Sequence, residues 1–382
     1  MQRQKLLWIL LGLAAIGAVV PMAAFVLLPG HPRSGAKRVS EGDSPIFVER
    51  KLGQSPSPGA ASRDVEEPAA EIDPALVQFV QTADIPAGLH DVRALAVGPD
   101  DHIYIGGDRA IRRFSPDGKP QGDIALESEP KCLAVGGADH ANPGRIYVGM
   151  EEHVEVFDAS REGDSPIFAA QKSGQSPMQK SGQPPAYARV AAWKTLGKTA
   201  ALTSIAAADR DVFVADAGNR IVWHYDVSGE LKGRIGDADT GRRIPGFLIT
   251  SHCFDLGLGA DGLLYVVNPR ALRLEGYTFS GDLETSWGRG SPEVDGFFGC
   301  CNPAQFAVLP DGRFVTAEKG APRIKIYSAQ GKFECVVAGP GAMRGTPADL
   351  AADHRGRILV LDASSASVRV FERKKETMGG ER

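Results

Sequence analysis

One strand pattern recurs six times along the 382-residue chain, and this repetition restricts the possible folds more than any other feature. The six copies are HIYIGG from His102, RIYVGM from Arg145, DVFVAD from Asp211, LLYVVN from Leu263, RFVTAE from Arg313 and RILVLD from Arg357. A second stretch follows each copy and ends on an aromatic residue, namely Phe114, Phe157, Tyr225, Tyr277, Tyr327 and Phe371. The copies lie about 43 to 52 residues apart, except that 66 residues separate the second from the third.

A period of this length, with several short strands in each unit, predicts a β-propeller in which every unit is one four-stranded blade. A single blade cannot bury both of its faces, whereas a closed ring gives every blade two neighbours. In four units a glycine follows four residues after the aromatic residue, as a hairpin turn with positive φ requires. These glycines are Gly118, Gly229, Gly281 and Gly331. We therefore predict an all-β, six-bladed β-propeller over residues 75–374.

The last unit ends after its third strand, so its fourth strand must come from another part of the chain. The apolar stretch ALVQFVQTADI, which begins at Ala75, has no other unit to belong to. We expect it to pair with the last blade and so to close the ring.

The N-terminus contains an uncharged apolar run over residues 6–28, which as a helix would span roughly 35 Å. The run predicts a transmembrane signal anchor behind a short cytoplasmic tip, and a cleaved signal peptide is the alternative. Two basic side chains precede the run and three follow it within ten residues, so the positive-inside rule is nearly balanced. The short basic tail favours a cytoplasmic N-terminus, which predicts a single-pass membrane protein with its propeller outside the cytoplasm.

Two near-identical peptides lie outside the repeat pattern: EGDSPIFVERKLGQSP from Glu41 and EGDSPIFAAQKSGQSP from Glu162. The first belongs to residues 29–74, whose Pro, Gly, Ser and Ala content predicts a disordered linker. The second belongs to a low-complexity insertion over residues 161–186, which we expect in a hairpin turn of the second blade. An insertion there explains the long spacing, although a recognition peptide displayed twice is the alternative. Residues 375–382 are predicted to be a disordered tail.

Two units resemble NHL repeats: ADRDVFVADAGNRIVWHYDVSGEL in the third and LPDGRFVTAEKGAPRIKIYSAQGKF in the fifth. Their shared features are a strand ending in A-D or an equivalent, a following N-R-I-type strand and a closing glycine turn. The similarity covers about residues 75–373, and the sequences GGDRAIRRF and GMEEHVEVF depart from it in the first two units. The resemblance implies an NHL-type six-bladed propeller of a membrane-anchored bacterial kind, a fold that is often a binding platform and occasionally an enzyme.

In a propeller, the loops before the innermost strands and the loops between second and third strands gather on one face. The segments SHC at Ser251 and GCCNP at Gly299 precede the first strands of consecutive units, so we expect them side by side. With the nearby polar loop residues they form the predicted binding face: His252, Cys253, Asn268, Arg270, Cys300, Cys301, Asn302, Glu318, Lys319 and Arg323.

The cysteines in this face have several interpretations. Outside the cytoplasm they suit a disulfide, either from Cys253 to Cys300 or Cys301, or between the adjacent Cys300 and Cys301. Plain buried or loop cysteines are the second interpretation, and a metal or redox site is the third. Cys132 and Cys335 lie in strand-like segments and are expected in the core.

Motifs of most enzyme classes are missing from the sequence. We find no C-x-x-C, H-E-x-x-H, G-x-S-x-G or P-loop, so no catalytic residue, metal or cofactor is predicted. The net charge is −4 without a basic stripe, which argues against nucleic acid. We predict a binding or scaffolding module for a protein or a small polar ligand. The alternatives are a metal-dependent lyase or lactonase, and a redox accessory protein that uses Cys300 and Cys301.

Overall fold

The computed structural model describes residues 70–160, 186–194, 196–250, 252–320, 322–343 and 345–375. The predicted anchor over residues 6–28, nearly all of the linker, the insertion and the tail lie outside these ranges. Within the ranges, no helix has the length and hydropathy that a membrane span needs. All strands that the structure describes belong to the compact unit of residues 64–382.

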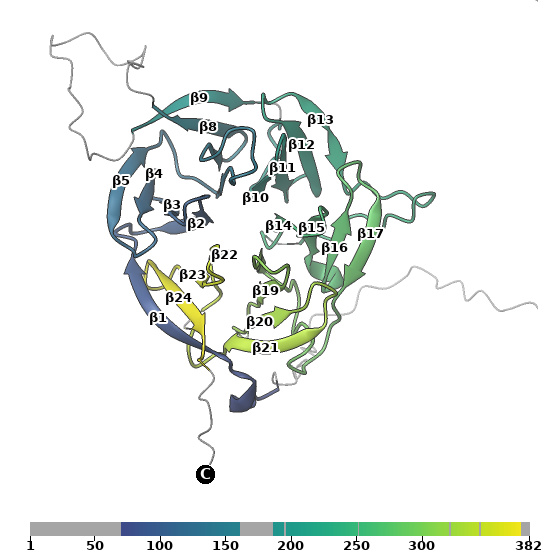
Figure 1. The fold of residues 1–382 in the computed structure, drawn as a ribbon. Helices are drawn as coiled ribbons and strands as arrows, with labels where there is room; N and C mark the ends of the chain where they lie inside the picture. Colours follow the sequence, from purple (N-terminus) through teal and green to yellow (C-terminus); the bar gives the residue numbers. More distant parts are fainter. Residues whose placement is uncertain are drawn as a thin grey trace, which may run out of the picture. The chain divides into compact units, whose positions relative to one another are not determined.

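Six four-stranded antiparallel sheets surround a central axis (Figure 1), which confirms the predicted six-bladed propeller. Blade one contains β2 (Val92–Val97), β3 (Ile103–Gly107), β4 (Ala110–Phe114) and β5 (Pro120–Ala125). Blade two contains β6 (Cys132–Val135), β7 (Ile146–Gly149), β8 (Val154–Ala159) and β9 (Tyr187–Trp193). Blade three contains β10 (Leu202–Ala207), β11 (Asp211–Asp216), β12 (Ile221–Asp226) and β13 (Leu231–Ile235). Blade four contains β14 (Leu256–Leu258), β15 (Leu264–Asn268), β16 (Arg273–Tyr277) and β17 (Leu283–Trp287). Blade five contains β18 (Gln305–Val308), β19 (Phe314–Ala317), β20 (Ile324–Tyr327) and β21 (Phe333–Ala338).

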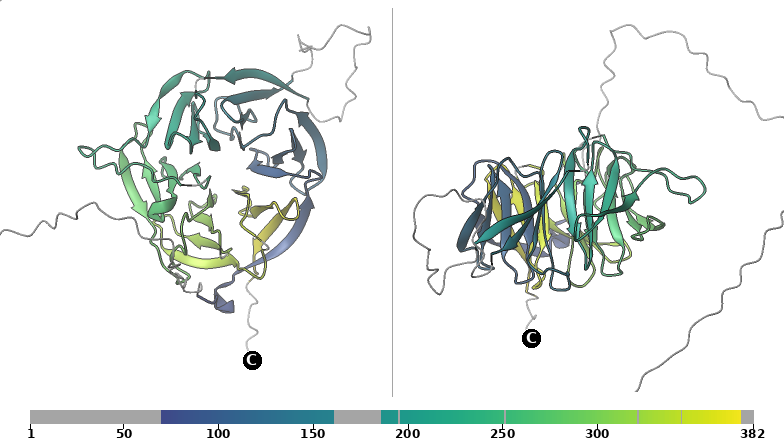
Figure 2. Two further views of the ribbon diagram at one scale, coloured as in Figure 1. Left: turned by 180° about the vertical axis from the view of Figure 1, so that it is seen from behind. Right: turned by 90° about the horizontal axis from the view of Figure 1, so that it is seen from above.

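The sixth blade is built from both ends of the propeller sequence. Its inner strands are β22 (Asp349–Ala352), β23 (Ile358–Asp362) and β24 (Ser367–Arg373), and its outer strand is β1 (Phe79–Pro86). β1 pairs antiparallel with β24 from Phe79↔Arg373 to Pro86↔Ser367, with one irregularity between Gln81 and Ala83. Figures 1 and 2 show the purple-blue β1 beside the yellow β24. The predicted closing strand is therefore confirmed.

Apolar and aromatic side chains fill the contacts between neighbouring blades. Tyr147, Trp193 and Tyr225 form a row of tilted ring contacts between blades two and three, with successive ring centroids 5.6 and 5.2 Å apart. Tyr225 and Tyr277, which end the third strands of their units, are fully buried. Cys132 and Cys335 are also buried in these contacts, as predicted. Such ring contacts add to the free energy gained from burying apolar area. The aromatic residues that recur in the sequence therefore stabilise the contacts between blades.

The four predicted hairpin glycines have positive φ, between 76° and 92°. The structure adds a second reason for glycine at three of them, and at Gly118 a Cβ would lie 2.9 Å from Cγ1 of Ile85 in β1. A Cβ at Gly331 would lie 2.2 Å from Cγ of Trp287, the last residue of the outer strand in the preceding blade. Trp193 stands in the same relation to Gly229. These turns therefore need glycine both for the backbone and for the packing of the previous blade.

The segment of residues 161–185 connects β8 to β9, two strands that pair up to Ala159↔Tyr187. The described residues on either side, Ser160 and Ala186, therefore lie at the end of a hairpin, where Ser160 N donates to Ala186 O at 2.7 Å. The sequence analysis expected the insertion at this place.

Candidate functional site

The loops of blades four and five are held in place by buried polar side chains at the ends of second strands. Asn268 follows the apolar part of β15, is 1% exposed and faces the loop that leads to β14. Its Oδ1 accepts a hydrogen bond from Leu248 N at 3.0 Å, and its Nδ2 donates to Gly246 O and Glu275 Oε1 at 3.1 Å. Because these groups are buried, every one of the bonds is needed to offset lost hydration. Asn268 therefore fixes the loop that carries His252 and Cys253.

Glu318 has the same position in blade five, where it forms a buried charged cluster. Its Oε2 accepts from Phe298 N at 2.8 Å and from Arg323 Nη2 at 2.7 Å, and Oε1 lies 2.6 Å from Lys325 Nζ. All three charged side chains are fully buried. Burial lowers the pKa of Lys325 to about 8, and the charge of Glu318 acts against this shift.

The same cluster holds the loop of residues 289–303 through its backbone. Arg323 Nη1 donates to Pro292 O and Glu293 O at 3.3 and 3.4 Å, and Lys325 Nζ donates to Gly296 O at 2.6 Å. Lys325 also lies 4.8 Å from the ring centroid of Phe297. The cluster therefore sets the position of the loop that ends in the two adjacent cysteines.

Asn302 ties that loop to the next one. It is fully buried; its Oδ1 accepts from Lys319 N at 2.9 Å, and its Nδ2 donates to Phe298 O and to Lys319 O. The neighbouring Cys301 is buried with φ of 62°, and its Sγ lies 3.2 Å from Thr250 Oγ1. The structure thus brings the segments around His252 and Cys300 together, as the sequence analysis expected.

Five of the ten predicted face residues are buried and act through these loops: Asn268, Cys301, Asn302, Glu318 and Arg323. The other five remain accessible and are named here the blade 4–5 rim: His252, Arg270 and Cys300 are exposed, and Cys253 and Lys319 are half-buried. Arg270 lies in a short 3-10 helix, Pro269–Ala271, directly after Asn268. Cys300 forms no disulfide, so the proposed bonds from Cys300 to Cys253 and to Cys301 are not present.

The sequence analysis missed a ring of residues at the propeller axis. In each blade, one residue at the start of the innermost strand pairs with the fifth residue of the second-strand motif. In chain order these six residues are Ala94, Cys132, Ser204, Asp255, Gln305 and Asp349. Asp255 Oδ2 accepts from Phe306 N in the next blade at 2.8 Å, and Asp349 Oδ2 accepts from Leu95 N at 2.7 Å. These side chains therefore pair the inner edges of neighbouring innermost strands.

Burial perturbs the ionisation of the axial groups. It raises the pKa of Asp255 to about 6 although three hydrogen bonds to the carboxylate act against it. The pKa of Asp349 lies well above its usual range because of burial, and the charge of Asp255 adds to the shift. The signal in the sequence was an Asp-Leu pair at the start of two innermost strands, Asp255-Leu256 and Asp349-Leu350.

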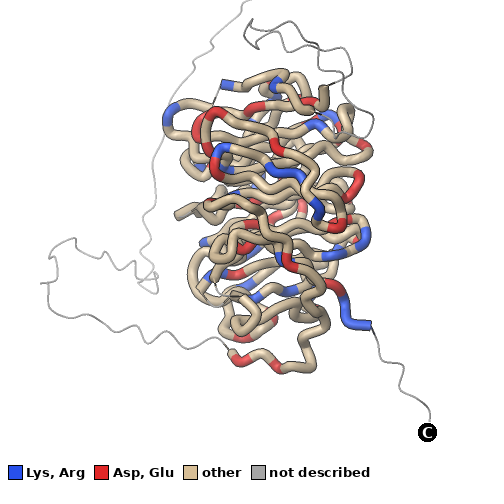
Figure 3. The backbone as a smooth tube through the Cα atoms, turned by 90° about the vertical axis from the view of Figure 1, so that its left-hand side faces the viewer, with Lys and Arg blue, Asp and Glu red and all other residues tan. Residues whose placement is uncertain are grey.

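A polar cavity of about 680 Å³ lies beside blade two. Its wall includes Glu155, which is 2% exposed and pairs with Arg189 Nη1 at 2.5 Å, and His153 lies 3.5 Å from the same oxygen. Across the described ranges, no group of three or more His, Cys, Asp or Glu side chains is arranged to hold a metal ion. Figure 3 shows that acidic and basic residues are interspersed along the side of the propeller that it displays.

No family model matches the sequence, and no curated protein matches it. Solved structures do match. Streptogramin B lyase has a TM-score of 0.50 and 12% identity, over 79% of this chain and 100% of the lyase chain. A structural-genomics protein of unknown function from Bacteroides thetaiotaomicron has a TM-score of 0.51 and 14% identity, over 78% of this chain and 76% of that one. The chain is a six-bladed β-propeller. At these identities the comparisons establish the fold alone.

Proposed function

We propose that this protein is an NHL-type binding module that recognises its partner or ligand with the blade 4–5 rim. The observation that carries the proposal is that half of the ten face residues are buried, whereas the other half are accessible to a partner. Buried Asn268, Asn302 and Glu318 hold the loops in one arrangement, and the loops present exposed His252 and Arg270. A surface that is ordered before binding loses less conformational entropy on association.

The charge of the rim favours an acidic partner. Arg270 and Lys319 are its two permanently charged residues, both are cationic, and neither takes part in an ion pair within the described ranges. Complementary charge steers encounter and fixes orientation more than it adds affinity. We therefore propose an acidic protein surface or a small anionic polar molecule as the bound species.

The test compares charge reversal on the two faces of the propeller. The full-length protein is purified with its anchor region and treated with a short cross-linker in cells, as wild type, as Arg270→Glu/Lys319→Glu and as Lys119→Glu. Lys119 is an exposed lysine next to the β4–β5 turn, so Lys119→Glu controls for the loss of a surface cation. The proposal predicts a co-purifying species that the rim variant loses and the control keeps. Equal recovery with all three proteins would exclude the rim.

The same preparation separates the alternative functions. A metal-dependent lyase or lactonase would carry a metal in stoichiometric amount, measured by elemental analysis. A redox accessory protein that uses Cys300 and Cys301 would lose two thiols, counted after unfolding, on mild oxidation, and Cys300→Ser would abolish that loss. The binding module shows neither behaviour.

We also propose that residues 6–28 anchor the protein in a membrane with the propeller outside the cytoplasm. Support comes from the uncharged apolar run and the short basic tail before it. Exposed Cys300 makes the orientation measurable, because a membrane-impermeant maleimide should label it in intact cells. Labelling only after permeabilisation would indicate the opposite orientation. Loss of labelling in Cys300→Ser would show that Cys300 is the labelled thiol.

A further inference from the structure

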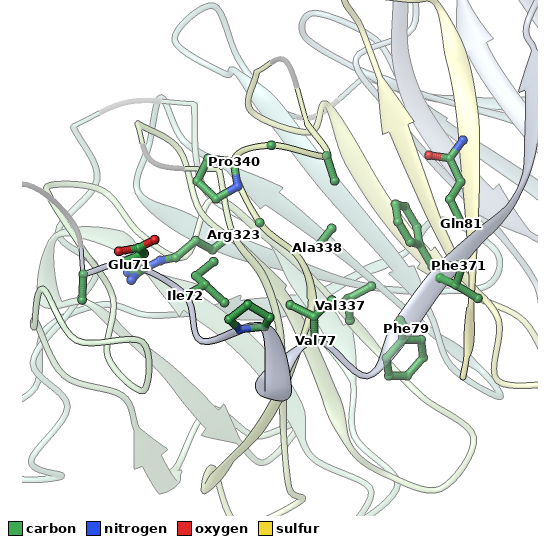
Figure 4. Close-up of a pocket in the computed structure, with 16 residues that line it drawn as sticks. Glu71, Ile72, Val77, Phe79, Gln81, Arg323, Val337, Ala338, Pro340 and Phe371 are labelled. Carbon is green, nitrogen blue, oxygen red and sulfur yellow. The ribbon is translucent and has the colours of Figure 1, made fainter. Parts of the chain in front are cut away.

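A second, chemically different cavity lies where the ring closes. It has a volume of about 790 Å³ and lies between the outer strand of blade five, β21, and the closing strand β1. Figure 4 shows apolar side chains along it, among them Ile72, Val77, Phe79, Val337 and Phe371. The volume falls within the range of roughly 300–1,000 Å³ that is typical of small-molecule sites.

The cavity exists because the N-terminal segment changes blades. Val77 forms a parallel bridge with Val336 of β21, and Gln78 N donates to Val336 O at 3.0 Å. The chain then leaves blade five and pairs with β24 from Phe79 onward. The two outer strands diverge at this point and leave apolar side chains uncovered, including Val80, which is 48% exposed.

One end of the cavity is positively charged. Arg323 lines it, is fully buried and uses Nη1 and Nη2 for hydrogen bonds to the loop of residues 289–303 and to Glu318. Its Nε has no hydrogen-bond partner among the described residues. The cluster of Arg323, Lys325 and Glu318 carries one net positive charge, and buried charge of this kind is costly unless it is paired.

An acidic side chain lies near the same end but does not neutralise this charge directly. Glu71 and Arg323 both line the cavity and are labelled in Figure 4, and Glu71 is exposed. No ion pair joins Glu71 to Arg323 in the part of the chain that the structure describes. The cavity thus combines a long apolar wall with one end where the buried cluster carries one net positive charge, Arg323 Nε has no partner among the described residues, and the exposed Glu71 carries a negative charge.

We propose that this cavity binds an unbranched aliphatic monocarboxylate of medium chain length. The aliphatic chain lies along Val77, Phe79 and Val337, and the carboxylate faces the Arg323 end. An anionic head complements the net positive cluster, and the chain covers apolar surface that β1 and β21 leave exposed. None of the five blade 4–5 rim residues is among the described residues that line the cavity, and Arg323 connects its wall to the loop of residues 289–303.

The test uses photo-cross-linking of the full-length protein in lipid nanodiscs with a diazirine analogue of dodecanoate. Mass spectrometry of the digested protein locates the adduct. The proposal predicts adducts on peptides that contain Val77 to Gln81 or Val337 to Ala342. Dodecanoate should compete with labelling more effectively than dodecyltrimethylammonium at the same concentration. Competition by octanoate, decanoate and dodecanoate should strengthen about four-fold for each methylene that is buried.

Three variants keep the result interpretable without disturbing the buried cluster. Val80→Glu places a charge on the apolar wall and should abolish labelling, whereas Leu231→Glu changes a similarly exposed residue on β13 and should not. Glu71→Gln removes the competing negative charge and should raise the affinity for dodecanoate about five-fold. Thermal unfolding of each variant checks that the propeller is intact.

Several results would overturn the proposal. One is labelling spread over the propeller without enrichment at β1 and β21. A second is stronger competition by the ammonium compound, which would assign the site to a cationic amphiphile attracted by Glu71. A third is an equal effect of Val80→Glu and Leu231→Glu, which would show that the probe does not use the cavity.

Discussion

The carboxylate of Asp255 accepts a hydrogen bond from the backbone N–H of Phe306 at 2.8 Å, and this bond joins the innermost strands of blades four and five. The other oxygen of Asp255 accepts from Leu256 N at 2.9 Å. Asp349 makes the equivalent pair of bonds to Leu95 and Leu350 between blades six and one. Each of these two carboxylates therefore accepts a hydrogen bond from a backbone N–H on the innermost strand of the next blade.

Asp255→Ala is expected to destabilise the propeller by about 1–3 kcal/mol, because it leaves the buried Phe306 N without an acceptor and leaves Leu256 N with only Ser204 Oγ at 3.3 Å. Asp117→Ala, at an exposed turn position, should change the free energy of unfolding by less than about 0.5 kcal/mol. Urea unfolding of the two variants measures the difference. Similar values for both would show that the axial bonds contribute little.

The raised pKa of Asp255 predicts the sign of its pH dependence. The folded-state value of about 6 exceeds the unfolded value of about 3.9, so the stabilisation is complete below about pH 4 and is lost as the pH rises through 6. Asp255 should therefore lower the free energy of unfolding by about 2 kcal/mol between pH 4 and pH 7.

The buried His140, whose pKa is lowered by burial, acts in the opposite direction in this range, so the comparison must be with Asp255→Asn. The variant removes the Asp255 contribution and keeps that of His140. It also removes the Asp255 charge that helps to raise the pKa of Asp349, so the measured difference contains the change at both carboxyl groups. The difference in stability between wild type and Asp255→Asn should therefore change with pH. A difference that stays constant from pH 4 to pH 7 would contradict the assignment.

Gly331→Ala and Gly356→Ala separate backbone strain from packing. Both glycines have φ of 76°, but a Cβ at Gly331 would meet Trp287, whereas a Cβ at Gly356 would meet no described atom within 4 Å. We expect a loss of about 1 kcal/mol at Gly356 and about 3 kcal/mol at Gly331. Equal losses in thermal or urea unfolding would mean that Trp287 moves aside without cost.

Glu318→Ala should be among the most damaging single substitutions in the described chain. It leaves Arg323 and Lys325 buried without a counter-charge, which costs about 3–5 kcal/mol. Glu334→Ala removes a partner of Arg313 at the surface and should cost less than about 1 kcal/mol. A small effect at Glu318, measured by urea unfolding, would show that water enters the cluster and solvates its cations.

The architecture was predictable because its signals are local. The second-strand motifs, the terminal aromatics such as Tyr225 and the turn glycines such as Gly331 each report on one blade. The closing strand followed from counting, since the last unit lacked a fourth strand and residues from Ala75 had no other place. The resemblance to NHL repeats pointed to the same ring but is matched by no family model.

The candidate site was predictable only in part. Whether each face residue is buried or exposed depends on contacts with loops that are distant in the sequence. Asn268 and Glu318 lie in loops by sequence, yet the loops from Gly246 to Leu248 and around Phe298 fold over them. The role of Asp255 depends on a donor in the next blade, 51 residues later, and nothing local to Asp255 indicates that partner. Residues 6–28 lie outside the described ranges, so the anchor remains a prediction.

The most direct test of the account places a photoreactive amino acid on each face of the full-length protein in cells. Position 270 lies on the blade 4–5 rim, and position 119 lies next to the β4–β5 turn. The account predicts a discrete adduct at position 270, identified by its mass, and none at position 119. An adduct at position 119 alone, or none at either position, would contradict a binding function of the rim.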